Sequence, residues 1–102
     1  MITAFSRFRL PPGLNREQIL ADIQHSLPMY KGRDGLIRKY ICIDIEQGVG
    51  TGVYLWNDRA KAEAFFAIAR AKIKEQTGSE PEISYMDTPV VVDNLTGEVA
   101  ID

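Results

Sequence analysis

Four side chains on two neighbouring predicted strands have the chemistry needed to hold a reacting small molecule. They are Arg38, Tyr40, Tyr54 and Trp56. A guanidinium can stabilise an oxyanion, a phenol can donate a hydrogen bond, and an indole can stack on an aromatic ring. Each residue also has a structural interpretation, in which the rings fill a core and the arginine extends its charged end into water. The choice between a chemical and a structural role depends on the strands that carry these side chains.

The residues lie in a predicted hairpin, 35–56, around which the chain is organised. Two segments rich in Ile, Val, Tyr and Trp, 36–45 and 51–56, flank a glycine-bearing break at 47–50. Such segments on either side of a short break predict two antiparallel strands. Because successive strand residues point to opposite sides of a sheet, each strand has two faces.

Both faces of this hairpin are largely apolar or aromatic. We place Arg38 and Tyr40 on one face, together with Tyr54 and Trp56 of the second strand. The other face of the first strand is mostly isoleucine. A half-buried hairpin normally has one polar face, so something must cover each side of this one.

The segment before the hairpin predicts a strand at 2–10 and a helix at 16–30. Prolines at 11–12 stop the strand, and Asn15 and Gln18 have capping-box spacing. Five residues of the helix form one apolar stripe that must pack on the sheet: Ile19, Leu20, Ile23, Leu27 and Tyr30. His25 lies opposite that stripe, where a histidine is usually solvated. Arg7 is either a solvated edge charge or an anion-binding group at the mouth of a pocket.

After the hairpin, Asn57 or Asp58 can cap a second helix that runs to about residue 76 and ends before Gly78. Its main apolar stripe is Ala62, Phe65, Phe66, Ala69 and Ile73. A second stripe contains only alanines, which we expect to be exposed, since alanine is the best helix former. Strands follow at 83–87 and 90–92, and the tail 95–102 is either a short extra strand or loosely ordered.

The order of elements predicts an α+β, ferredoxin-like βαββαβ domain with an antiparallel sheet over residues 1–94, followed by the tail 95–102. Two helices on one face leave the other face of the sheet bare. The apolar character of both hairpin faces therefore predicts a homodimer, in which two sheets pack face to face in a dimeric α+β barrel.

Composition bears on the classes of partner. The 102 residues have a net charge of −2, with scattered charges that favour neither a nucleic acid nor a membrane as partner. The absence of a leader pattern or long apolar run predicts a cytoplasmic protein. Cys42 is the only cysteine, and we expect it to be a small buried hydrophobe. No metal or nucleotide motif occurs, so we expect no metal and no cofactor.

Four segments carry a resemblance to a known family: ITAFSRFRLPPG at 2–13, GLIRKYI at 35–41, GVYLWNDRAKAEAF at 52–65 and YMDTPVVVDN at 85–94. Together they resemble the small YdhR-like proteins assigned as monooxygenases, within the dimeric α+β barrel superfamily. The resemblance implies a ferredoxin-like dimeric barrel. It also implies oxidation of an aromatic or polycyclic small molecule by O2, without metal or flavin.

For such a reaction the protein supplies an apolar cavity and a few polar groups that bind the developing anion. The hairpin face with Arg38, Tyr40, Tyr54 and Trp56 has the residue types for this catalytic role. The residues expected to contact the aromatic substrate are Arg7, Phe8, Tyr30 and Phe66.

Two alternatives bear on function. Some barrel relatives degrade haem with a histidine on the second helix, but residues 59–76 contain none, which argues against haem chemistry and leaves no obvious general base. A non-catalytic small-molecule binding or stress-related protein is the other alternative, because one fold hosts many functions. The discriminating feature is whether the aromatic cluster encloses a pocket of a few hundred cubic ångströms.

Overall fold

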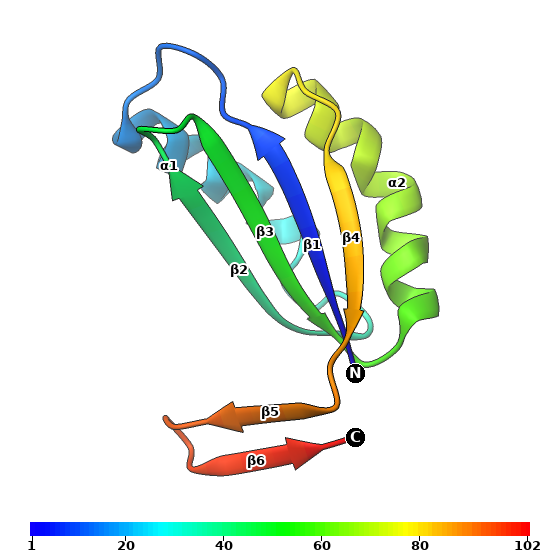
Figure 1. Cartoon of the computed structure of the whole chain (residues 1–102). Helices are drawn as coiled ribbons and strands as arrows, with labels where there is room; N and C mark the ends of the chain where they lie inside the picture. Colours follow the sequence, from blue (N-terminus) through cyan, green and yellow to red (C-terminus); the bar gives the residue numbers. More distant parts are fainter.

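The computed structural model describes residues 1–102 and confirms the α+β, ferredoxin-like architecture (Figure 1). The elements in chain order are β1 (Ile2–Arg9), α1 (Arg16–Ser26), the short 3-10 helix η1 (Leu27–Met29), β2 (Leu36–Asp44), β3 (Val49–Trp56), α2 (Arg59–Thr77), β4 (Glu82–Asp87), β5 (Val90–Asp93) and β6 (Glu98–Ile101). The first four strands form one antiparallel sheet in the order β2-β3-β1-β4. Strands β5 and β6 pair only with each other, and β6 lies in the predicted tail.

Side-chain caps fix both main helices. The side chain of Asn15 accepts a hydrogen bond from the Gln18 backbone N–H at 2.9 Å, and the Gln18 side chain accepts one from the Asn15 N–H, which completes the predicted capping box. Asp58 caps α2 by accepting from the backbone N–H of Lys61 at 2.8 Å. Gly78 ends α2 with φ 73°, in the left-handed region that favours glycine.

The first helix is shorter than predicted. It ends at Ser26, and the chain continues as η1 with Pro28 in its first turn. Proline has no backbone N–H, and its ring collides with the carbonyl four residues earlier, so an α-helix cannot run through this position undistorted. The chain therefore turns back earlier and brings Tyr30 against the core.

Both helices lie on the same face of the sheet, and the core lies between these layers (Figure 1). Its buried residues are Ala4, Tyr54, Trp56, Ala62, Phe65, Phe66, Ala69 and Ile73. The predicted main stripe of α2 is thus the buried one, and the alanine stripe of the same helix is exposed, as expected. No helix has the length and apolar character needed to cross a membrane.

The opposite face of the sheet, which we call the open face, is covered by no element (Figure 1). Tyr40 is 53% and Met86 63% exposed on it. Cys42 is also exposed there, so its predicted burial is wrong, because its side of β2 faces away from the helices. The β5–β6 hairpin projects beyond one end of the sheet, and Asp93 on it forms an ion pair with Arg38.

Candidate functional site

The cross-strand register separates the four catalytic candidates. Tyr54 lies opposite Lys39 and is buried with Trp56 beneath the helices. Arg38 and Tyr40 flank Lys39 on β2, so their side chains point to the opposite side of the sheet and belong to the open face. The prediction that all four share one face is therefore wrong.

The length of the turn explains this result. Asp44 pairs with Val49, so the loop between them has four residues, 45–48. An even loop pairs even-numbered residues of one strand with odd-numbered residues of the other, which inverts the grouping made by parity alone. A bulge between Leu36 and Arg38 then returns Leu36 to the helix side, opposite Trp56.

A cavity of about 340 Å³ lies between the helix-facing side of the sheet, α1 and the C-terminal end of α2. Three of the predicted residues line it: Tyr54, Phe8 and Tyr30. Aliphatic side chains from the same elements, such as Ile41 and Ile73, complete a mostly apolar wall. The volume and lining are those of a small-molecule site rather than of a fully packed interior.

The remaining candidates lie outside this cavity. Trp56 and Phe66 belong to the buried core, where their ring centroids lie 6.2 and 4.9 Å from that of Tyr54. They hold the Tyr54 ring in place and do not line the cavity. Arg7 is exposed on β1 and lines only shallow hollows at the surface.

Lys39 also lines the cavity and is not among the site residues predicted from the sequence. Its Nζ atom lies 3.4 Å from the ring centroid of Tyr54 and 4.0 Å from that of Tyr30, over the faces of both rings. Such cation–π contacts partly replace the water that the ammonium loses. The signal in the sequence is that Lys39 is the only charged residue on the isoleucine face of its strand.

Burial shifts the protonation of this cluster. It lowers the pKa of Lys39 to about 7, against an opposing electrostatic effect of the Cys42 thiol. Burial also raises the pKa of both Tyr30 and Tyr54 above their ordinary values. At neutral pH the amine is therefore close to half protonated, whereas both phenols keep their protons and can donate hydrogen bonds.

Glycine allows the lysine and the tyrosine to lie over β3. A Cβ atom at Gly52 would stand 2.9 Å from Nζ of Lys39 and 2.8 Å from Cε1 of Tyr54. Any side chain at this position would push both groups out of their places. Gly52 itself lines the cavity.

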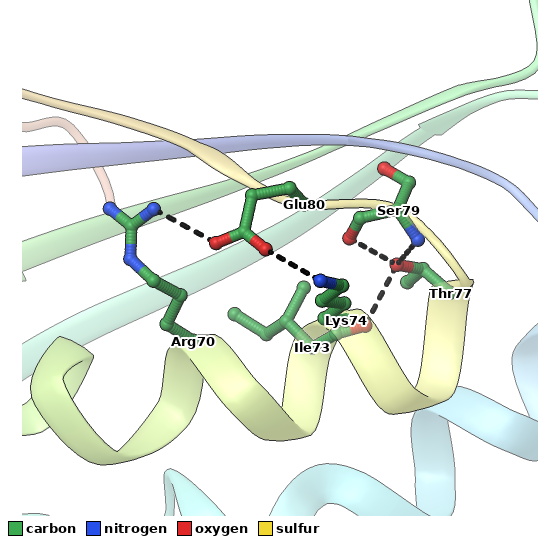
Figure 2. A network of polar contacts seen from close by, with 6 residues as sticks. All are labelled: Arg70, Ile73, Lys74, Thr77, Ser79 and Glu80. Atoms are coloured by element: carbon green, nitrogen blue, oxygen red, sulfur yellow. Dashed lines mark hydrogen bonds and ion pairs between the residues drawn. The ribbon is translucent and has the colours of Figure 1, made fainter.

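Polar contacts fix the end of α2 that closes the cavity (Figure 2). Glu80 accepts a hydrogen bond from Arg70 at 3.2 Å and lies 3.5 Å from Nζ of Lys74. The Thr77 hydroxyl donates to the Ile73 carbonyl at 2.7 Å and accepts from the Ser79 backbone N–H at 3.2 Å. The last turn of α2 is thereby held to the segment that leads into β4.

The exposed lining residues form a polar rim. Asp22 and His25 come from α1, and Gln76 comes from α2. His25 is exposed, as predicted, and the structure adds that it lies at the edge of the cavity. No group of three His, Cys, Asp or Glu side chains is arranged to hold a metal ion.

Comparison with known proteins gives no matching family model and no matching curated protein. Solved structures do match. A protein from Deinococcus radiodurans provisionally assigned as an antibiotic biosynthesis monooxygenase superposes with a TM-score of 0.65 at 11% identity, over 91% of this chain and 97% of that one. A protein from Bordetella bronchiseptica with the same assignment gives 0.65 at 18% identity, over 85% and 95%.

A third match is SnoaB, a cofactor-independent oxygenase from Streptomyces nogalater, solved as a mutant form. It superposes with a TM-score of 0.62 at 12% identity, over 85% of this chain and 91% of that one. Identities this low show a shared fold and leave the activity open. The chain therefore has the ferredoxin-like α+β fold of these structures.

Proposed function

We propose that this protein is a monooxygenase that oxidises an aromatic small molecule in the cavity between the sheet and the helices, without a metal or a flavin. The observation that carries the proposal is the cavity of about 340 Å³, with tyrosines and a lysine set in an apolar wall. The fold shared with SnoaB, which is described as a cofactor-independent oxygenase, supports the same reaction class. The resemblance of the sequence segments to the YdhR-like proteins points the same way.

The proposed reaction needs no external reductant. A substrate of the anthrone type has a methylene group beside an aromatic ring, and its oxidation by O2 gives a carbonyl group and one water molecule. The carbon loses four electrons and O2 accepts them, so atoms and electrons balance. The protein has to exclude bulk water, orient the ring and stabilise the anion that reacts with O2. The Tyr54 hydroxyl is the donor that we assign to that anion.

Replacing Tyr54 with phenylalanine tests this assignment. The ring and its packing stay, but the hydrogen-bond donor is lost, and we expect kcat/KM to fall about 100-fold. The measurement is O2 uptake with hydroxylated anthrones and quinols as substrates. Tyr85→Phe is the matched control, because Tyr85 packs against the same core and does not line the cavity. If the wild-type protein binds these compounds without O2 uptake, the non-catalytic binding protein is the correct alternative.

The same assay decides where the site lies. If the cavity is the site, Arg38→Ala and Tyr40→Phe keep their turnover, because these side chains belong to the open face. The sequence-based assignment gives the opposite result, with turnover lost in both variants. Loss in these two variants together with full activity in Tyr54→Phe would place the reaction on the open face.

We also propose that the protein is a homodimer in which a second copy covers the open face. Exposed apolar side chains lie both on that face and on the β5–β6 hairpin: Tyr40, Met86, Val90, Val92, Val99 and Ile101. A two-stranded hairpin is marginally stable alone in water, so this one needs a surface to pack on. An interface of two identical faces would cover both features with one symmetric contact.

Light scattering coupled to size-exclusion chromatography measures the assembly. We expect a mass of twice the 11.4 kDa chain at micromolar concentration. Introducing a charge in the middle of the open face, as in Val53→Asp, should shift the protein to the monomer, because burying an unpaired carboxylate is costly. Glu75→Gln, on an exposed position of α2, is the control. A wild-type protein that stays monomeric would contradict the proposed dimer.

A further inference from the structure

Lys39 carries a cavity amine that has no carboxylate partner. Its Nζ atom lies over the faces of Tyr30 and Tyr54, and it takes part in none of the ion pairs of the chain. The other lysines lie towards the surface, whereas Lys39 lines the cavity. The protein thus offers this amine the π-electrons of two rings and no carboxylate.

The ionisable groups around the amine are few. Helix α1 contributes Asp22 and His25, which are exposed and sit at the rim. Tyr30 and Tyr54 face it from the loop after η1 and from β3, and Cys42 lies on its own strand. The part of α2 that lines the cavity contributes no ionisable side chain. The state of the amine therefore depends strongly on what fills the cavity.

We propose that Lys39 is the base that removes the hydroxyl proton of a phenol or enol bound in this cavity, and that the resulting ammonium then holds the phenolate or enolate. The O–H bond of the ligand breaks, an N–H bond forms on Nζ, and no electrons leave either partner. The inference rests on the proposed oxygenase function and supplies the general base that the sequence did not reveal.

The surroundings select a weakly acidic hydroxyl over a carboxylic acid. A carboxylic acid is already ionised in neutral water and loses much hydration on entering an apolar wall. A phenol enters neutral, and its proton moves only after the amine and the hydroxyl are together. The ion pair that forms is shielded from bulk water by the apolar wall. Opposite charges attract more strongly in such surroundings than in water. The ring faces of Tyr30 and Tyr54 stabilise the new ammonium.

A coloured phenol tests the proton transfer without any oxidation. 4-Nitrophenol is yellow as the phenolate and nearly colourless as the phenol, so its absorbance reports the form that is bound. Titrations of the probe with wild-type protein between pH 5 and 8 are compared with the same titrations of Lys39→Met. Lys72→Met is the matched control, because Lys72 is exposed on α2 and does not line the cavity.

With wild-type protein and with Lys72→Met, we expect the bound probe to ionise at a pH at least about one unit lower than the free probe, a tenfold change in its ionisation constant. With Lys39→Met the shift should disappear. The proposal is overturned if the shift in the ionisation of the probe survives in Lys39→Met. It is also overturned if the wild-type protein does not bind the probe, or binds it without shifting its ionisation. Circular dichroism verifies that each variant is folded.

O2 uptake separates this proposal from the proposed function. Lys39→Met should lower kcat/KM at least about 100-fold, the usual contribution of a general base. Lys39→Arg, whose guanidinium keeps its charge, should retain the probe shift and lose O2 uptake. Wild-type O2 uptake that persists in Lys39→Arg refutes the base and leaves the oxygenase intact. A probe shift without O2 uptake by wild-type protein refutes the oxygenase and leaves the proton transfer intact.

Discussion

Replacing Lys39 with methionine is expected to raise the free energy of unfolding at pH 7 by about 3 kcal/mol. Burial lowers the pKa of this lysine from 10.5 to about 7. At pH 7, where the folded amine is about half protonated and the unfolded amine is fully protonated, a shift of that size costs the folded state about 4 kcal/mol. The loss of two cation–π contacts offsets about 1 kcal/mol of the gain. Urea unfolding of both proteins at one protein concentration measures the difference.

The same substitution should remove most of the dependence of the protein's stability on pH between pH 7 and 10. Between pH 7 and 10.5 the unfolded chain binds a proton on Lys39 that the folded chain has released. The stability of the wild-type protein therefore rises with pH, by up to about 1.4 kcal/mol per unit. Above about pH 10 the trend reverses, because the buried Tyr30 and Tyr54 keep their protons longer than the unfolded phenols do.

Urea unfolding at pH 7, 8 and 9 covers the range in which Lys39 is expected to make the stability rise with pH. Wild-type protein and Lys72→Met should share the rising slope, whereas Lys39→Met should have a much flatter profile. An equal slope in Lys39→Met would show that another group controls the pH dependence. A fall in stability of that variant at pH 7 would show that the contacts of the lysine with the two rings outweigh its desolvation.

Replacing Trp56 with alanine is expected to lower the free energy of unfolding by about 3–5 kcal/mol. The side chain is fully buried, and its ring centroid lies 5.4 Å from that of Phe65 and 6.2 Å from that of Tyr54. The cavity left by the indole would be lined by rings that cannot collapse into it. Since Tyr54 loses its stacking partner, its position in the candidate site should loosen as well.

Trp56→Phe is the informative comparison. The indole Nε1 atom is buried without a hydrogen-bond partner. Phenylalanine removes that unpaired donor and keeps most of the apolar contact, so we expect a loss of at most about 1.5 kcal/mol. Thermal and urea unfolding of Trp56→Ala and Trp56→Phe measure how much stability each variant loses relative to the wild-type protein. Similar losses in both would mean that the indole makes a polar contact that phenylalanine cannot replace.

The two faces of the sheet therefore have different expected roles. The helix-facing side carries Lys39 and Tyr54 beside a cavity, and its chemistry follows from burial. The open face carries Arg38 and Tyr40, and we propose that a second copy of the chain covers it. Mutations on the first face should change ligand binding and turnover, whereas mutations on the second should change assembly.

Local patterns of residues are enough to predict the elements and the fold class. Strand alternation, the capping box at Asn15 and the glycine at position 78 act over a few residues, so local physics suffices to place them. Periodicity also identified the buried stripe of α2, because a single helix face faces the core. Pro28 marks the same region, but the local pattern alone does not specify that α1 ends at Ser26.

The set of residues that forms the candidate site depends on contacts between distant segments of the chain. Parity states which residues of one strand share a face, but the four-residue turn at 45–48 set which faces of β2 and β3 coincide. That register put Lys39 beside Tyr54 and removed Arg38 from it. The low pKa of Lys39 has the same origin, because desolvation depends on the elements packed around an amine and not on its neighbours in the chain.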